Sequence, residues 1–335
     1  MSPASEDAVP VPPSPSPRPW GSYIVRVLVV AACYYLGARL GLLQALVNDQ
    51  VTPLWPPTGV AVLALLVGGL RLWPGVSLGA LVVNASLSDL PSVLAICAGN
   101  TLAPVAACLL LRRAGFRLEL DRTRDAMALV LLGALAGMAV SATIGSAALL
   151  ASGVVGGDRF WSTWAVWWTG DALGVLVLVP LALALRSPRW RRPAVRRWVE
   201  AAALVGSLTV VMLIATTTDV RLMYLVYPFL IWAALRFQHL GTAPCALIAT
   251  TLAARGAAMS TGPFAGMDLL VRMVGLQAYN GTAVLTALLL STVIAERNAA
   301  RAAIERTVEQ LTEVVGRYQP APLGDLLPPR RPEGP

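Results

Sequence analysis

Apolar residues fill most of this chain in long runs that are separated by short polar loops. The runs cover residues 23–47, 56–70, 73–87, 90–111, 126–151, 160–185, 198–216, 221–237, 240–258 and 269–294. A helix of about 20 apolar residues crosses a bilayer, and hydrocarbon forces each span to satisfy its own backbone hydrogen bonds. The pattern therefore predicts an all-α, polytopic integral membrane helical bundle with eight to ten transmembrane helices.

The stretch from Leu54 to Asn84 accounts for the uncertainty in that number. Its two short apolar runs each open with a Trp-Pro pair and are joined at Gly68-Gly69-Leu70-Arg71. Proline fits the first turn of a helix, where its missing N–H costs nothing. We expect two short helices in a hairpin, either two full spans or a re-entrant pair, with Trp55 and Trp73 at the two membrane–water interfaces.

The two ends of the chain differ from this apolar middle. Residues 1–20 and 319–335 are rich in proline, which predicts disordered tails. Between the membrane domain, 21–296, and the second tail, residues 297–318 predict a short coiled-coil-like helix that leads into no output domain. Its apolar positions, Ile304, Val308, Leu311 and Val315, span only about two heptads, which allows a homodimer.

The distribution of charged residues indicates how this chain is oriented in a membrane. Hydrophobic residues make up 56% of the chain and charged residues 13%, a balance that excludes a soluble domain. Arginines crowd into the loops that follow even-numbered runs, whereas the opposite loops hold only Arg159, Arg221 and Arg255. The positive-inside rule then predicts a multi-pass protein of the plasma (cytoplasmic) membrane with both termini in the cytoplasm. The net charge is +8, but the arginine-rich loop at 186–198 lies next to membrane spans. It therefore indicates contact with anionic membrane lipids, and we expect no nucleic-acid partner.

Asp171 is the most informative polar residue inside a span. It lies 11 residues after Phe160, so about 16 Å of helix rise places it near the bilayer midplane. Trp161, Trp164 and Trp168 precede it on the same helix face. A carboxylate below these indoles could bind a cation or an amine, or it could instead pair with an arginine of the bundle. Arg39 is the first candidate for that counter-charge and Arg272 the second.

Further polar residues lie in neighbouring runs. Asn84 falls towards the outer end of its run, Asn100 falls mid-span, and Thr58 follows the Trp-Pro-Pro turn. Such residues either line a site or act as interhelical hydrogen-bond partners. The predicted ligand-binding set consists of Asp171, Asn100, Asn84, Thr58, Arg39, Trp164 and Trp168.

Several signals for chemistry are missing from the sequence. His239 is the single histidine, and the four cysteines lie in apolar runs without a Cys-x-x-Cys pair. No glycine-rich phosphate loop is present, and one carboxylate seldom carries a reaction alone. We therefore expect no enzymatic activity, no cofactor and no bound metal.

Several motifs together resemble a known family. They are Trp55-Pro56-Pro57-Thr58-Gly59, Arg71-Leu72-Trp73-Pro74-Gly75, Gly99-Asn100-Thr101-Leu102, Trp168-Thr169-Gly170-Asp171-Ala172-Leu173-Gly174 and Gly262-Pro263-Phe264. In this order, over about residues 23–298, the chain resembles the membrane-associated sensor domain, MASE type 1. In that family Glu often follows the Gly-Asn-Thr-Leu motif, whereas Ala103 and Pro104 stand here.

The resemblance implies a bacterial inner-membrane sensory module, a kind usually fused to histidine kinases, diguanylate cyclases or cyclic-di-GMP phosphodiesterases. We expect a stand-alone signal-input domain that recognises a small ligand or a membrane state and signals through a separate cytoplasmic protein. The alternative is a small-solute transporter, since broken helices and midplane charges also occur there. A third interpretation is a scaffold that recruits a partner through residues 295–317.

Overall fold

The computed structural model describes residues 20–43, 52–85, 89–186 and 195–317. The predicted tails lie outside these ranges, except for Trp20, which begins the first helix. All the regular elements in the described residues are helices, as the apolar runs predicted. In order they are α1 (Trp20–Leu42), α2 (Pro56–Gly68), η1 (Leu70–Leu72), α3 (Trp73–Asn84), α4 (Leu90–Arg113), α5 (Thr123–Ala128), η2 (Leu129–Ala136), α6 (Gly137–Ala151), η3 (Gly157–Arg159), α7 (Phe160–Arg186), α8 (Val195–Thr217), η4 (Met223–Leu225), α9 (Val226–Phe237), α10 (His239–Ala258), η5 (Gly262–Phe264) and α11 (Leu269–Arg317).

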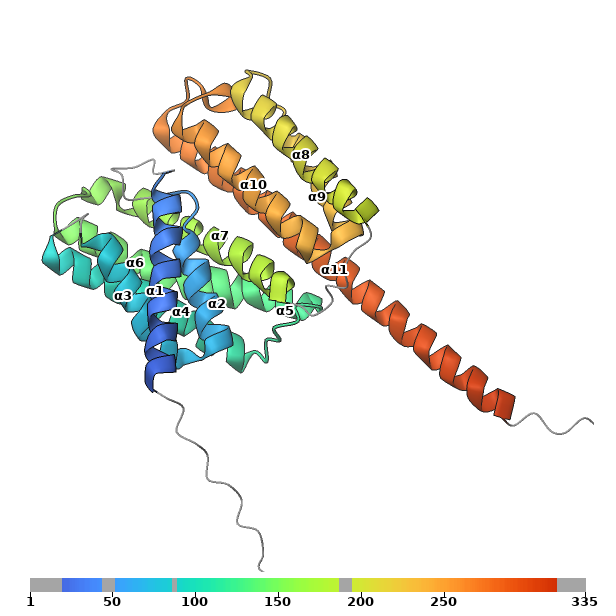
Figure 1. The fold of residues 1–335 in the computed structure, drawn as a ribbon. Coiled ribbons are helices and arrows are strands. Elements are labelled where there is room, and N and C mark those ends of the chain that lie inside the picture. The colour runs from blue at the N-terminus through green and yellow to red at the C-terminus, as the bar shows by residue number, and fades with distance from the viewer. Residues whose placement is uncertain (1–19, 44–51, 86–88, 187–194, 318–335) are drawn as a thin grey trace, which may run out of the picture.

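The helices form two groups that meet at α7 (Figure 1). In the first group α1 packs against α2 and α3, and α4 packs against α3 and α6. In the second group α10 packs against α8, α9 and α11. Helix α7 contacts α2 and α6 on one side and α10 and α11 on the other, so it links the two groups.

Six helical segments of the described residues are long and apolar enough to cross a membrane. They are Gly21–Leu42, Leu90–Arg113, Thr123–Ala151, Gly157–Arg186, Val195–Thr217 and Leu269–Val314. Helices α2 and α3 have 13 and 12 residues, which correspond to roughly 20 Å of rise. Because the hydrocarbon core is about 30 Å thick, these lengths favour the re-entrant arrangement of the hairpin.

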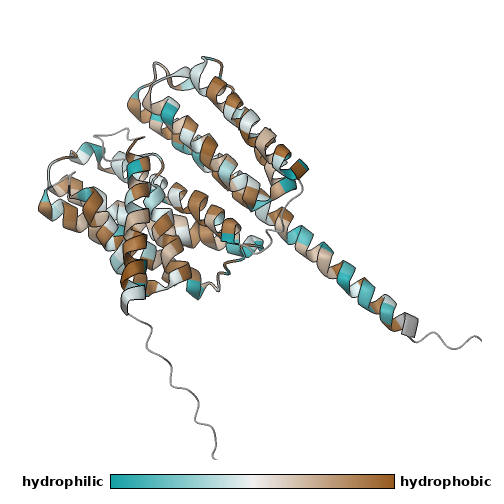
Figure 2. Cartoon of the chain, viewed as in Figure 1, coloured by the Kyte–Doolittle hydropathy of each residue, from teal (hydrophilic) through white to brown (hydrophobic). Residues whose placement is uncertain are grey.

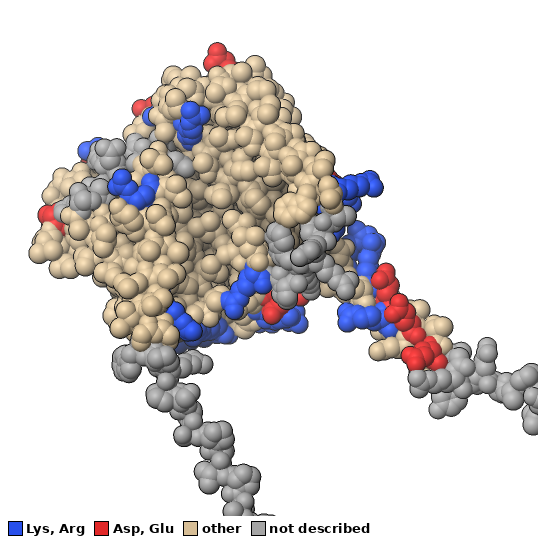
Figure 3. Space-filling model, in the orientation of Figure 1, with Lys and Arg blue, Asp and Glu red and all other residues tan. Residues whose placement is uncertain are grey.

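The outer surface of the bundle is apolar, as a lipid-facing surface must be. Large hydrophobic side chains such as Leu28, Leu94 and Val210 are more than half exposed, and apolar residues cover the helices of both groups (Figure 2). Basic groups gather along the edge from which α11 leaves the bundle (Figure 3). The projecting end of α11 is mostly hydrophilic, in contrast to the rest of the molecule.

Trp55 was predicted to lie at a membrane–water interface, but the structure places it inside the bundle. Its backbone N–H donates to the carbonyl oxygen of Gly170 at 3.0 Å, and Asp171 follows directly in α7. The non-helical residues before it, Thr52 and Leu54, are buried. Helix α2 therefore begins inside the protein at the depth of Asp171, where neighbouring helices satisfy the irregular backbone. Trp73, in contrast, is 51% exposed, which suits an interface.

The C-terminal helix extends well beyond the last predicted span. Helix α11 runs without a break over 49 residues, so the predicted coiled-coil-like helix continues the last span. All described side chains at 297–314 are exposed. A movement of α11 inside the bundle would therefore carry the projecting part with it.

Candidate functional site

The Asp171 carboxyl group joins three helices. The Thr58 hydroxyl of α2 donates to Asp171 Oδ1 at 2.7 Å, and the Ser141 hydroxyl of α6 donates to Oδ2. The Trp167 indole provides a further polar contact from α7 itself. Asp171 is 1% exposed, so these groups replace the water that a carboxyl group would otherwise bind. We call Asp171, Thr58, Ser141 and Trp167 the Asp171 cluster.

Glycines allow α2 and α7 to approach closely enough for these bonds. A Cβ atom at Gly59 would lie 2.2 Å from the carbonyl oxygen of Gly174, and a Cβ atom at Gly174 would lie 2.0 Å from that of Trp55. A Cβ at Gly170 would meet the Thr52 carbonyl oxygen at 2.5 Å. The Trp-Pro-Pro-Thr-Gly and Thr-Gly-Asp-Ala-Leu-Gly motifs are thus the two sides of one helix contact.

A second set of polar side chains adjoins the Asp171 cluster. The phenol of Tyr34, 1% exposed, lies beside the Asn100 amide and the Trp55 indole and close to Asp171. One residue further along α4, the Thr101 hydroxyl pairs with that of Ser77 at 2.8 Å. Tyr34 therefore connects Asn100 of α4 to the neighbourhood of Asp171.

The structure does not bring the predicted arginines to Asp171. Arg39 is exposed at the end of α1, and Arg272 donates to the Ser260 hydroxyl. The ion pairs found in the described residues join Arg117 to Glu119 and Asp121, and Arg236 to Glu200. The predicted counter-charge is replaced by neutral donors, because hydroxyls on α2 and α6 lie against the carboxyl group instead.

Asn84 lies apart from this group. It is 7% exposed, and its amide donates to the Ala80 carbonyl oxygen of its own helix at 2.8 Å. This bond gives Asn84 a local partner at the end of α3.

The predicted indoles form a ladder that turns towards α6. Trp164 stacks on Trp168 with 5.2 Å between ring centroids. The Trp164 N–H donates to the Thr143 hydroxyl at 3.0 Å, and the Trp168 N–H donates to the Leu135 carbonyl oxygen at 2.7 Å. Both N–H groups are therefore engaged, and the indole that contacts the carboxyl group is Trp167.

Ser141, Trp167 and Tyr34 were not among the predicted site residues. A signal for Ser141 was present, because Gly137, Ser141 and Gly145 recur at intervals of four and form a small-residue face on α6. Trp167 lies in a cluster of four tryptophans, in which helix periodicity does not select one. Tyr34 lies in an apolar run beside a second tyrosine, so the sequence does not indicate which of the two faces the interior.

The site provides hydrogen-bond donors around one carboxyl group, and its buried position excludes bulk water. Such a carboxyl group can bind a proton, or it can exchange a hydroxyl partner for a donor on a bound molecule. The described residues hold no group of three or more His, Cys, Asp or Glu side chains that could bind a metal ion. The Asp171 cluster is therefore suited to specific hydrogen bonding where α2, α6 and α7 meet.

The profile of the MASE1 family of membrane-associated sensor domains matches residues 26–298. Comparison with curated proteins and with solved structures gives no match. The matched range begins in α1 and ends within α11, so it includes every residue of the Asp171 cluster.

Proposed function

Since the chain belongs to the MASE1 family of membrane-associated sensor domains, we propose that it recognises a small ligand or a membrane state at the Asp171 cluster. It then signals through α11 to a separate protein. The membrane is the cytoplasmic membrane, with both termini in the cytoplasm. Tyr34 and Asn100 extend the recognition site towards α1 and α4.

One observation carries the proposal: α7 supplies Asp171 and also packs against α11. A ligand can shift a conformational equilibrium only if it binds the two states with different affinity. At Asp171 a bound donor would replace the Thr58 or Ser141 hydroxyl and change how α2 and α6 sit on α7. Because α7 touches α11, the change would reach the helix that leaves the bundle.

The projecting part of α11 is the surface offered to the partner. Ile304, Val308 and Leu311 are 64%, 54% and 59% exposed on one face of the helix. An isolated helix of this length is marginal in water, and a second helix would cover the apolar face. A cytoplasmic signalling protein or a second copy of the chain could supply it.

The test is affinity purification of the intact protein in mild detergent, with mass spectrometry of the small molecules and proteins that co-purify. Asp171→Asn keeps the shape of the side chain and removes its charge. We expect this variant to lose a retained molecule that the wild-type protein holds, or to lose the partner. Asp158→Asn, at an exposed position in η3 just before the same helix, is the matched control and should retain both. A folded Asp171→Asn protein with an unchanged set of bound molecules and partners would exclude the Asp171 site.

A small-solute transporter is the second candidate. The observation that favours it is the buried, non-helical entry to α2 beside Gly170, because broken helices near the midplane form transporter sites. Uptake of a co-purified solute into proteoliposomes would decide for transport. Binding without flux would leave the sensor as the better description.

A further inference from the structure

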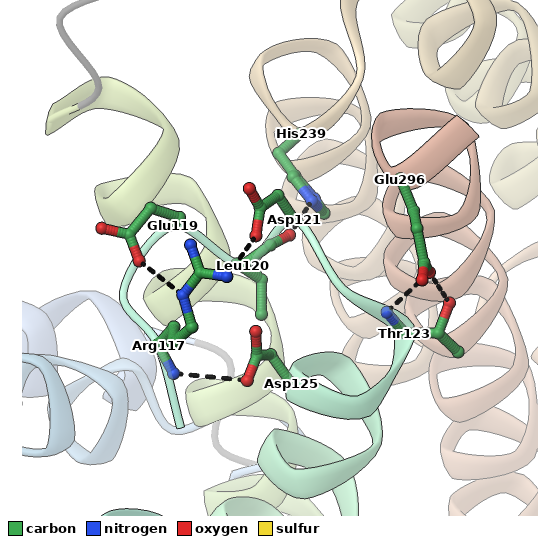
Figure 4. Close-up of polar contacts among 8 residues, drawn as sticks. All are labelled: Arg117, Glu119, Leu120, Asp121, Thr123, Asp125, His239 and Glu296. Atoms are coloured by element: carbon green, nitrogen blue, oxygen red, sulfur yellow. Dashed lines mark hydrogen bonds and ion pairs between the residues drawn. The ribbon is translucent and has the colours of Figure 1, made fainter. Parts of the chain in front are cut away.

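The start of the α5–η2–α6 helix is capped by a residue from the far end of the sequence. This continuous helix covers Thr123–Ala151, and the first N–H groups of any helix lack partners within it. Arg122, at the N-cap position, makes no side-chain cap bond. Instead Glu296 Oε2 of α11 accepts from the Thr123 backbone N–H at 2.9 Å and from the Thr123 hydroxyl at 2.6 Å (Figure 4).

A carboxylate in this position is favourable for two reasons. Hydrogen bonds to an ionised acceptor are stronger than neutral ones, and negative charge is stabilised at the positive end of the helix dipole. Both oxygen–donor contacts lie at the protein surface, so water can compete for them. The contact therefore has a defined geometry, but water can replace either hydrogen bond.

A histidine connects the same loop to α11 a second time. His239 Nε2 lies 2.9 Å from the Leu120 carbonyl oxygen, and His239 Nδ1 lies 2.8 Å from the Ser291 hydroxyl. A carbonyl oxygen can only accept, so Nε2 carries the proton of that bond. Ser291 lies on α11 five residues before Glu296, and Leu120 lies three residues before Thr123. Residues 120–123 are thus tied to α11 at two points.

The loop itself has a defined shape. Leu120 is buried and has a backbone φ of 48°, a left-handed conformation that is uncommon for a residue with a side chain. The Arg117 backbone N–H donates to Asp125 Oδ1 at 3.3 Å, and the Arg117 side chain pairs with Glu119 and Asp121. Figure 4 shows these contacts around the loop. A loop held in this way can transmit a displacement.

The helix capped by Glu296 also reaches the Asp171 cluster. Ser141, which donates to Asp171 Oδ2, lies on the same continuous helix as Thr123, roughly 27 Å of rise away. Between the two lies η2, a π-helical stretch over Leu129–Ala136. Such stretches are places where a helix can change its hydrogen-bond register, and they often occur at functional sites.

We propose that the Glu296–Thr123 contact is a latch through which the state of the Asp171 cluster sets the position of the projecting part of α11. The proposal rests on the function proposed above and adds its route of regulation. Beyond Glu296 all described side chains of α11 through residue 314 are exposed, so this is the last point at which the bundle holds the helix. A shift of α5–η2–α6 at Ser141 makes or breaks the cap at Thr123.

Distances between spin labels on the full-length protein in nanodiscs test the latch. The labels are placed at Arg113→Cys and Gln310→Cys, two exposed positions on α4 and α11, in a Cys33→Ala background. We expect a narrow distance distribution with Glu296 present. Glu296→Ala should broaden and shift it, and Glu296→Gln, which keeps an acceptor, should do so less. Glu305→Gln, an exposed glutamate further along α11, is the matched control and should leave it unchanged.

A second comparison tests the link to the site. Ser141→Ala should shift the same distribution, and combining it with Glu296→Ala should add nothing, because both act on one contact. A Glu296→Ala distribution that superimposes on the wild type overturns the latch, even if Asp171→Asn loses its ligand. A Ser141→Ala distribution that superimposes on the wild type also overturns it. If Glu296→Ala and Ser141→Ala both shift the distribution but Asp171→Asn retains the ligand, the proposed ligand site is excluded and the latch is supported.

Discussion

Gly174 shows how a missing side chain positions the candidate site. The carbonyl oxygen of Trp55 occupies the place where a Cβ at this position would lie, at 2.0 Å. Any larger residue would push α2 away from α7 and lengthen the Thr58 hydroxyl bond to Asp171. The stability of the bundle and the geometry of the site therefore both depend on the absence of a Cβ atom at Gly174.

We expect Gly174→Ala to lower the stability of the bundle by about 1–3 kcal/mol, the usual cost of overpacking. The measurement is thermal unfolding in detergent. Gly206→Ala is the matched control, since a Cβ there meets nothing within 4 Å and alanine favours a helix. Equal stability of the two variants would mean that α2 and α7 are not in tight contact.

The helices end and begin as their local chemistry requires. Prolines occupy the first turns of α2, α3 and α4, where no N–H is needed. Helix α4 has in addition an Asp89 side chain that accepts from the Ser92 N–H at 3.3 Å. The side-chain and backbone hydrogen bonds from Ser92 hold the pKa of the Asp89 carboxyl below its ordinary value. This cap is built from four neighbouring residues and is independent of the bundle.

Asp89→Ala should lower the melting temperature at neutral pH, because α4 loses its cap. A carboxyl group whose pKa is depressed on folding stabilises the fold above its unfolded pKa, and this contribution disappears as the pH falls through the folded pKa. The difference between wild type and variant should therefore shrink in acid. Melting curves from neutral to acidic pH check this, with Asp219→Asn, in another exposed loop, as the control. A difference that is constant with pH would rule out an ionised cap.

The whole molecule combines an apolar bundle with a charged, projecting helix. Arginines concentrate in the loops on the side from which α11 leaves, and Figure 3 shows basic groups along that edge. Anionic lipids of the cytoplasmic leaflet attract such groups. The shape and the charge therefore favour the same orientation, with α11 directed into the cytoplasm.

Cysteine labelling in intact cells tests that orientation. In a Cys33→Ala background, Asp158→Cys should react with a membrane-impermeant maleimide added outside. Arg113→Cys should react only after the membrane is permeabilised. Both positions are exposed, so access to the reagent and not burial controls the reaction. The reverse pattern would invert the topology.

Hydrophobic runs and arginine positions were enough to predict a helical membrane bundle, because helix length and hydropathy are local properties of the chain. The same holds for the Pro-initiated helices. The partners of Asp171 were not local. Thr58 and Ser141 lie 113 and 30 residues from it, and Glu296 lies 173 residues from the Thr123 that it caps. Helix periodicity indicates which face a side chain occupies, but close packing at the glycines selects the helix that it meets, so these contacts arise from the tertiary arrangement.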